Sequence, residues 1–122
     1  MGFNRFVPAF AVAVAAAVVM TAGAVSAHAR LVSSTPAANA TVAPPRSIAL
    51  TFSERMVPAF STLEVVNAAG AKAAVSTTVS EDGRSITGAL ARPLATGGYT
   101  VNWQIASSDG HRMTGSYAFT VR

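Results

Sequence analysis

The fold is decided by the segment Tyr99-Thr-Val-Asn-Trp-Gln-Ile105, in which apolar and polar side chains alternate at every position. Successive side chains of an extended strand point to opposite faces, so this period of two predicts a half-buried β-strand. The apolar side chains that share one face are Tyr99, Val101, Trp103 and Ile105. One apolar face per strand is typical of antiparallel sheets that cover a single core.

Other short runs repeat this alternation and are separated by Gly, Pro, Asn and Asp. No segment after Ala29 shows a sustained apolar period of three to four residues, so helices are not expected to be a major part of the domain. About seven short strands of this kind predict an all-β, two-sheet Greek-key sandwich of immunoglobulin-like or cupredoxin-like type. The expected strands fall at 31–32, 47–52, 62–66, 73–79, 85–90, 99–105 and 116–121.

The first 27 residues have the pattern of a secretory signal peptide: a basic start, an apolar stretch and a small-residue site. Cleavage after Val25-Ser-Ala27 releases a 95-residue domain, 28–122, that begins at His28. A second possible site, Ala27-His-Ala29, releases a chain that begins at Arg30 instead. We therefore expect residues 1–27 to be removed and the domain to be exported, and the two sites remain alternatives.

Composition limits the chemistry that is available. The chain contains no cysteine, so disulfides and thiolate metal sites are excluded. Without the leader, eight Lys and Arg face five Asp and Glu, for a net charge of +3. The basic residues are scattered along the chain rather than gathered in a stripe, and no nucleic-acid partner is expected.

Among the few metal-binding residue types present, His28 is unusual because cleavage after Ala27 makes it the first residue. Its free amine and its imidazole Nδ1 can then chelate one metal, and nitrogen donors in a flat arrangement suit Cu(II). The alternative is that His28 is simply a solvated terminal residue.

A second candidate is the segment Ser107-Ser-Asp-Gly-His111. Asp109 and His111 can share one ion, or Asp109 can orient the imidazole. In the alternative interpretation, Asp109 only shapes an Asp-Gly turn through hydrogen bonds to its own backbone. Glu54, after the strand that ends at Phe52, either pairs with an arginine at the surface or approaches the same end as His111.

Hydrolytic chemistry is not indicated, because the sequence has no nucleophile turn and no paired histidines on a helix. The mature chain is therefore not expected to be an enzyme.

Taken together, several segments resemble the CopC family of periplasmic copper-binding proteins. The similarity covers almost the whole mature chain, in order. Its segments are His28-Ala-Arg-Leu-Val-Ser-Ser-Thr-Pro36, Leu50-Thr-Phe-Ser-Glu54, Tyr99-Thr-Val-Asn-Trp103, Ser107-Ser-Asp-Gly-His111 and Gly115-Ser-Tyr-Ala-Phe-Thr-Val121.

The resemblance implies a Greek-key β-sandwich that binds one Cu(II) per chain. By position, His28 supplies its amine and imidazole, His111 an imidazole, and Asp109 a carboxylate oxygen. Glu54 is a weak ligand or touches another ligand. The family also implies a periplasmic carrier or buffer in copper homeostasis or resistance, with a membrane copper permease as a partner, and we expect a monomer.

Two departures from the family pattern narrow this expectation. Some members hold Cu(I) in a methionine-rich loop, whereas Met56 and Met113 are isolated here, so no dedicated Cu(I) site is expected. Many relatives begin His-x-His, whereas the third mature residue here is Arg30, so a binding mode through that residue is unavailable.

Two other functions remain as alternatives to a copper carrier. An N-terminal histidine with a second histidine on a β-sandwich also resembles the copper site of oxidative polysaccharide-cleaving enzymes. An aspartate ligand would fill the position that oxygen needs there, and the aromatic residues fit inward strand positions rather than a binding face. A metal-free structural sandwich is the third possibility, favoured if cleavage occurs before Arg30.

Overall fold

The computed structural model describes residues 29–122, so the expected leader and His28 lie outside the described residues. Eight strands and one 3-10 turn are present in this part of the chain. They are β1 (Leu31–Thr35), β2 (Thr41–Val42), β3 (Ser47–Phe52), the 3-10 turn η2 (Pro58–Phe60), β4 (Thr62–Asn67), β5 (Val75–Val79), β6 (Ser85–Leu90), β7 (Gly97–Ala106) and β8 (Arg112–Val121). No helix within 29–122 is both long and apolar enough to cross a bilayer.

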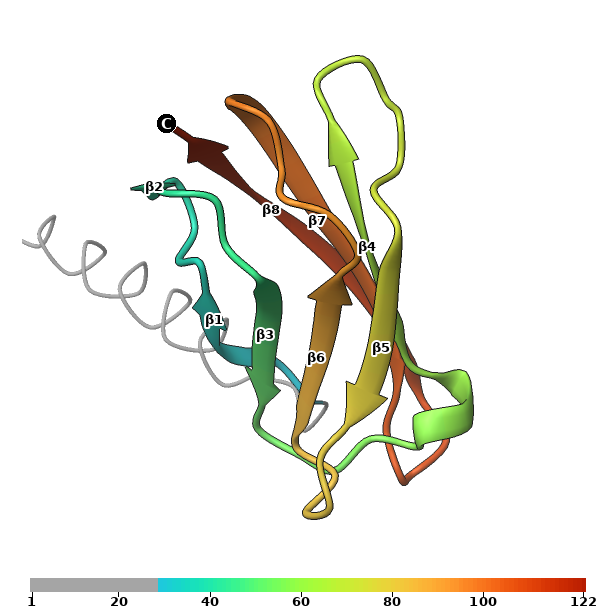
Figure 1. Cartoon of the computed structure of the whole chain (residues 1–122). Coiled ribbons are helices and arrows are strands. Elements are labelled where there is room, and N and C mark those ends of the chain that lie inside the picture. Colours follow the sequence, from blue (N-terminus) through green and yellow to red (C-terminus); the bar gives the residue numbers. More distant parts are fainter. Residues whose placement is uncertain (1–28) are drawn as a thin grey trace, which may run out of the picture.

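The strands form two four-stranded sheets that face each other, as Figure 1 shows. One sheet has the order β1-β3-β6-β5 and the other the order β2-β8-β7-β4. Only β5–β6 and β7–β8 are hairpins within one sheet, and every other connection crosses from one sheet to the other. The predicted all-β sandwich is therefore confirmed.

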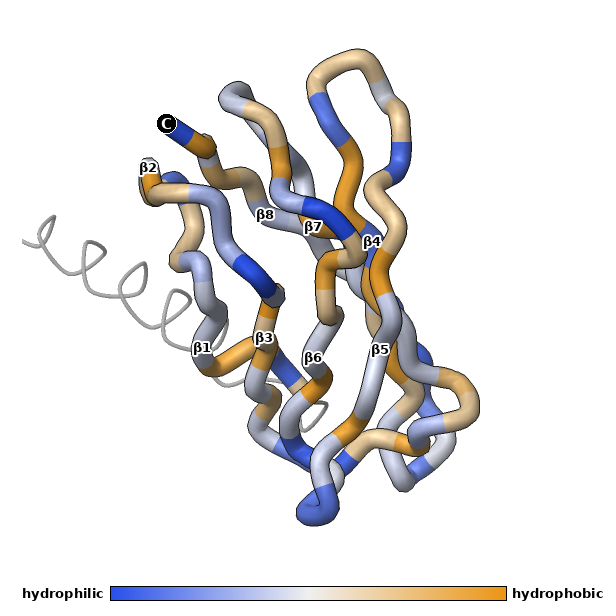
Figure 2. Tube along the Cα trace, viewed as in Figure 1, coloured by the Kyte–Doolittle hydropathy of each residue, from blue (hydrophilic) through white to orange (hydrophobic). Residues whose placement is uncertain are grey.

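The core lies between the sheets and consists of the side chains that the period of two places inward. Ile48, Leu50 and Phe52 on β3 are almost fully buried, and Val101 and Ile105 on β7 face them from the other sheet. Figure 2 shows the resulting change between hydrophobic and polar residues along the strands, with a strongly hydrophilic turn between β5 and β6. Burial of each large aliphatic side chain contributes about 1.5–3 kcal/mol.

Trp103 is partly buried and packs against this core. Its ring meets Phe52 edge-on at a centroid distance of 5.0 Å, and its neighbour across the ladder is Gly115 on β8. A Cβ at Gly115 would lie 2.2 Å from Trp103 Cζ2. The ring therefore occupies the space that any larger residue at position 115 would need.

The structure adds one strand that the sequence pattern did not predict, β2. Its two residues pair in parallel with the end of β8, and Thr120 and Arg122 donate backbone hydrogen bonds to Ala40 and Val42. A two-residue strand is too short to show a period, which is why alternation does not reveal it.

The strand register sorts the loops into two ends of the sandwich. The lower end in Figure 1 carries residues 29–30, 53–57, 80–84 and 107–112, because Phe52 lies beside Leu31 and Ala106 pairs with Arg112. The upper end carries residues 43–46, 67–74, 91–96 and Arg122. Segments that are far apart in the sequence thus meet at each end.

Candidate metal centre

The loop between β7 and β8 at the lower end is closed by its own hydrogen bonds. The backbone N–H of the fully buried Ser107 donates to the His111 carbonyl at 2.9 Å, and Gly110 N–H donates to the Ser107 carbonyl at 2.9 Å. Gly110 has a φ of +93°, a conformation that favours glycine. The Asp-Gly-His sequence therefore forms a tight turn that fixes the positions of Asp109 and His111.

Asp109 stabilises this turn through one carboxylate oxygen. Oδ1 accepts hydrogen bonds from Ser107 Oγ and from the backbone N–H of His111, the latter at 3.1 Å. These two donors, with a smaller contribution from the His111 side chain, lower the pKa of Asp109 from 3.8 to about 2. The carboxylate is therefore ionised at neutral pH.

The other oxygen of Asp109 faces the His111 imidazole. Oδ2 lies 3.1 Å from His111 Nδ1, and the two side chains are 45% and 59% exposed. This contact orients the imidazole ring through Nδ1, and Asp109 does not contact the other ring nitrogen, Nε2. The turn-forming and the orienting interpretations of Asp109 both hold at once, on different oxygens.

The segment that follows β3 lies against this loop and carries Glu54. Met56 forms a β-bridge with Ser107, Val57 N–H donates to the Ala106 carbonyl at 2.8 Å, and Ser108 N–H donates to the Arg55 carbonyl at 3.2 Å. Glu54 is partly exposed at the same end as His111. Within residues 29–122 the structure shows no direct contact of its carboxylate with Asp109 or His111.

The first described residues are held at this end as well. Ala29 is fully buried, Arg30 N–H donates to Ser53 Oγ at 3.0 Å, and Ser53 N–H donates to the Arg30 carbonyl at 2.9 Å. Arg84 Nη1 donates to the Ser53 carbonyl at 2.8 Å. Ser53, the residue before Glu54, therefore anchors the N-terminal segment at this end of the sandwich.

Sequence reasoning missed the supporting roles of Ser53, Ser107 and Arg84. Both serines lie inside segments quoted above. Ser53 accepts a hydrogen bond from the distant backbone of Arg30, which leaves no local signature, whereas Ser107 bonds Asp109 within its own loop. Among residues 29–122, no three His, Asp or Glu side chains are grouped so that they could hold a metal. A metal at this end therefore needs a donor in addition to Asp109 and His111.

Comparison with known proteins identifies related chains. Residues 31–122 match the family model described as the CopC domain. The chain is 35% identical over 121 residues to copper resistance protein C of Xanthomonas campestris pv. juglandis, covering 89% of this chain and 95% of that protein. It is 39% identical over 116 residues to copper resistance protein C of Pseudomonas syringae pv. tomato, covering 88% and 90%.

Two solved structures share the fold. The crystal structure of PcoC, a methionine-rich copper resistance protein from Escherichia coli, superposes with a TM-score of 0.73 at 36% identity, covering 79% of this chain and all of that one. The crystal structure of CopC from Methylosinus trichosporium OB3b also gives a TM-score of 0.73, at 32% identity, covering 77% and 93%.

Proposed function

Because this chain belongs to the CopC domain family, we propose that it is an exported copper-binding protein that holds one Cu(II) ion and acts as a copper carrier or buffer. The observation that carries this proposal is that the Asp109–His111 pair and the anchored N-terminal segment lie at the same end of the sandwich. The Asp109 carboxylate is ionised and orients the His111 imidazole, and both side chains are partly open to solvent. His28 directly precedes the buried Ala29, so cleavage after Ala27 would create a terminal histidine next to it.

In this proposal His28 supplies its amine and its imidazole, His111 a second imidazole and Asp109 a carboxylate oxygen. Three nitrogen donors and one oxygen form a set that Cu(II) accepts in a flat arrangement. Glu54 contributes weakly or through another ligand.

Acid should release the copper through its nitrogen donors. An α-amine has a pKa of about 8 and an imidazole about 6.5, and each must lose its proton to ligate. Protons compete little with copper for the Asp109 carboxylate in this range, because its neighbours hold the pKa of this carboxyl at about 2. Affinity should therefore fall between about pH 8 and 5, well before Asp109 titrates.

We further propose that residues 1–27 are a cleaved leader, that 28–122 is the mature domain in the periplasm or an equivalent space, and that a membrane copper permease receives the ion. The names of the bacterial relatives support a role in copper resistance. An Asp109 oxygen bound to copper would fill the position that a copper oxidase needs for oxygen, which favours a carrier over such an enzyme.

Native mass spectrometry of the exported protein, with and without one equivalent of Cu(II), tests the proposal. We expect a chain that begins at His28 and retains one copper. His111→Asn should abolish stoichiometric retention, whereas Thr114→Ala, an exposed change on β8, should preserve it. A chain that begins at Arg30, or one that begins at His28 and keeps no copper, would show that the proposal is wrong.

A further inference from the structure

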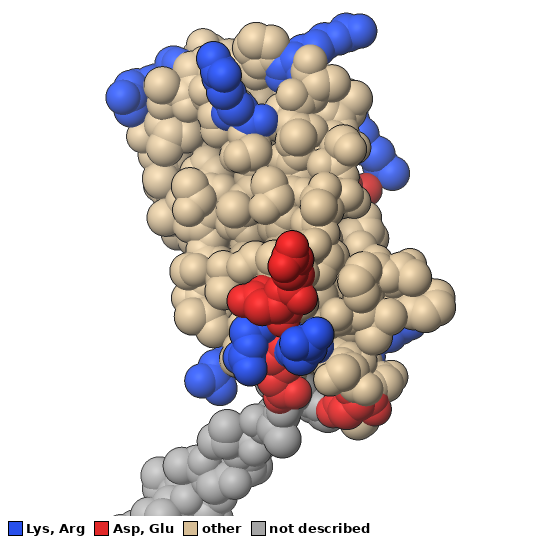
Figure 3. Space-filling view, turned by 60° about the horizontal axis from the view of Figure 1, so that its bottom comes forward, with Lys and Arg blue, Asp and Glu red and all other residues tan. Residues whose placement is uncertain are grey.

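Basic residues that are scattered in the sequence are sorted by the fold. The lower end carries four arginines together with four carboxylates, and these side chains balance. They are Arg30, Arg55, Arg84, Arg112, Glu54, Glu81, Asp82 and Asp109. Figure 3 shows red and blue side chains intermixed at this end and blue side chains at the far end.

The upper end has Arg46, Lys72, Arg92 and Arg122, and its segments 43–46, 67–74 and 91–96 contain no Asp or Glu. Lys72 pairs with Glu64 at 3.2 Å. Within residues 29–122 the three arginines form no ion pair with a carboxylate. The excess positive side-chain charge of the domain therefore lies at the end opposite the candidate metal centre.

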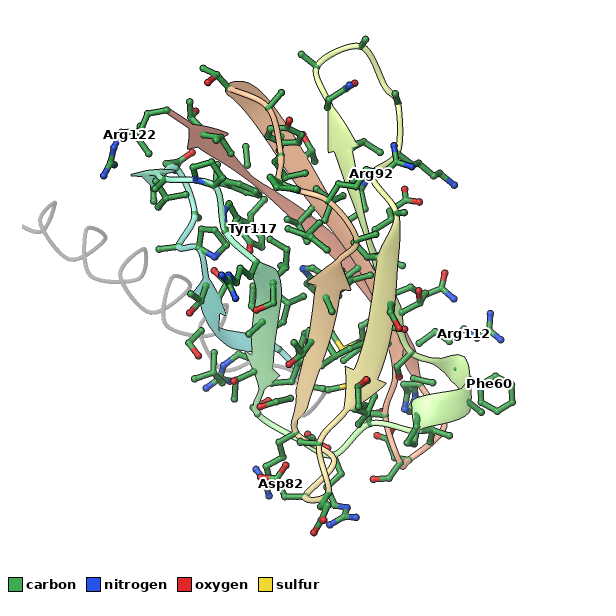
Figure 4. The ribbon with its side chains drawn as sticks, in the orientation of Figure 1. Phe60, Asp82, Arg92, Arg112, Tyr117 and Arg122 are labelled. Carbon is green, nitrogen blue, oxygen red and sulfur yellow. The ribbon has the colours of Figure 1, made fainter. Side chains whose placement is uncertain are left out.

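Hydrogen bonds hold the segments that carry these arginines. Leu90 N–H donates to the Arg46 carbonyl at 2.9 Å, which holds the segments of Arg46 and Arg92 side by side. Arg122 Nη1 donates to the Thr41 carbonyl at 3.0 Å. Figure 4 shows Arg92 and Arg122 at the upper end and Asp82 at the lower end.

The surface between Arg46 and Arg92 is a shallow groove of about 500 Å³, lined by three prolines and Leu90. All three arginines are exposed. Arg46 and Arg92 line this groove together, whereas Arg122 lies well apart from Arg92 in Figure 4, so the three arginines do not converge on one small anion. The exposed large apolar residues of the described chain, Val32 and Phe60, lie on β1 and η2 instead.

We propose that the upper end binds the surface of an anionic phospholipid bilayer. The binding hot spots of a protein interface are usually Trp, Tyr or Arg side chains in a packed pocket. An end with several exposed arginines and no exposed aromatic side chain therefore fits a flat, charged surface better. Near an anionic bilayer each Lys or Arg strengthens binding about fivefold, so three arginines give about a hundredfold. Association is weak and salt-sensitive, because the Debye length is only about 8 Å at physiological ionic strength.

This binding mode would orient the domain. β7 and β8 have ten residues each and run between the two ends, a length of about 30 Å at 3.3 Å per residue. The lower end would therefore face away from the bilayer, open to the exported space. This inference does not depend on the ligands of copper.

Flotation with lipid vesicles tests the proposal, using the exported protein at low and physiological salt. We expect binding to vesicles of phosphatidylcholine mixed with an equal amount of phosphatidylglycerol, weaker binding at higher salt, and none to phosphatidylcholine alone. The combined Arg46→Gln, Arg92→Gln and Arg122→Gln variant should bind about a hundredfold more weakly.

The matched control removes the same charge from the lower end, by combining Arg30→Gln, Arg55→Gln and Arg112→Gln, and should change partitioning much less. Equal losses in both variants would show that net charge alone drives binding and would overturn the proposal. So would an absence of binding to the anionic vesicles. If immobilised polyglutamate but not vesicles retains the protein through the upper arginines, the partner is an acidic protein and the bilayer proposal is wrong.

Discussion

Replacing Ser53 with alanine tests whether the anchored N-terminal segment matters for copper. The substitution removes the Oγ that accepts the Arg30 N–H at 3.0 Å. It keeps the backbone pair from Ser53 N–H to the Arg30 carbonyl at 2.9 Å and the Arg84 contact to the Ser53 carbonyl at 2.8 Å. The change therefore loosens the segment next to His28 without removing any proposed ligand.

The size of the effect follows from one hydrogen bond. A net intramolecular hydrogen bond contributes about 0.5–1.5 kcal/mol, and the exposed Arg30 N–H can take water in its place. If copper binding requires the segment in its anchored position, the affinity for Cu(II) should fall by the same free energy, about two- to tenfold. The ligands do not change, so the electron paramagnetic resonance spectrum of bound Cu(II) should stay close to that of the parent protein.

Competition with a chelator measures the affinity, and chemical denaturation of the copper-free protein measures stability. The matched control is Ser85→Ala, which removes the 3.0 Å contact between Ser85 Oγ and Thr51 Oγ1 but does not touch the N-terminal segment. It should lower stability without weakening copper binding. Unchanged affinity in Ser53→Ala, or an equal loss in Ser85→Ala, would refute the reasoning while leaving the copper site of the parent protein in place.

Three further changes test the core and the loop. Gly115→Ala should destabilise the fold by about 1–3 kcal/mol, because its Cβ would meet Trp103 Cζ2 at 2.2 Å. Urea unfolding followed by the fluorescence of Trp103 measures this loss. The control Gly98→Ala, with no atom within 4 Å of the added Cβ, should be nearly neutral. Asp109→Asn should reduce stability at neutral pH. The difference from the parent protein should disappear as the pH falls from about 4 through 2, because the folded pKa of the Asp109 carboxyl, about 2, lies below its ordinary 3.8. Thermal unfolding across this pH range shows whether the two stability curves converge. Glu54→Gln should weaken Cu(II) binding only slightly in chelator competition, and a loss as large as that of Asp109→Asn would make Glu54 a principal ligand.

The sandwich was predictable because its signal is local. On β3 and β7 the period of two alone places Ile48, Leu50, Val101 and Ile105 inside, and the structure buries all four. The Asp-Gly-His turn is local in the same sense, since Asp109 bonds its own loop. The metal roles of Asp109, His111 and Glu54 remain proposals, and His28 lies outside the described residues.

What the sequence by itself determined is the strands other than β2, their inward faces and the tight turn between Ser107 and His111, because each depends on side chains a few residues apart. Only the tertiary structure decided that Ser53 holds the segment of Arg30 at the same end as that turn. The gathering of Arg46, Arg92 and Arg122 at the other end was equally invisible in sequence order. These placements result from the crossing of the chain between the two sheets and from the register of its strands. Register follows from which faces are buried and from the connecting turns, but β1–β3 and β4–β7 pair strands that are distant in the sequence, so no single short window shows which strands meet.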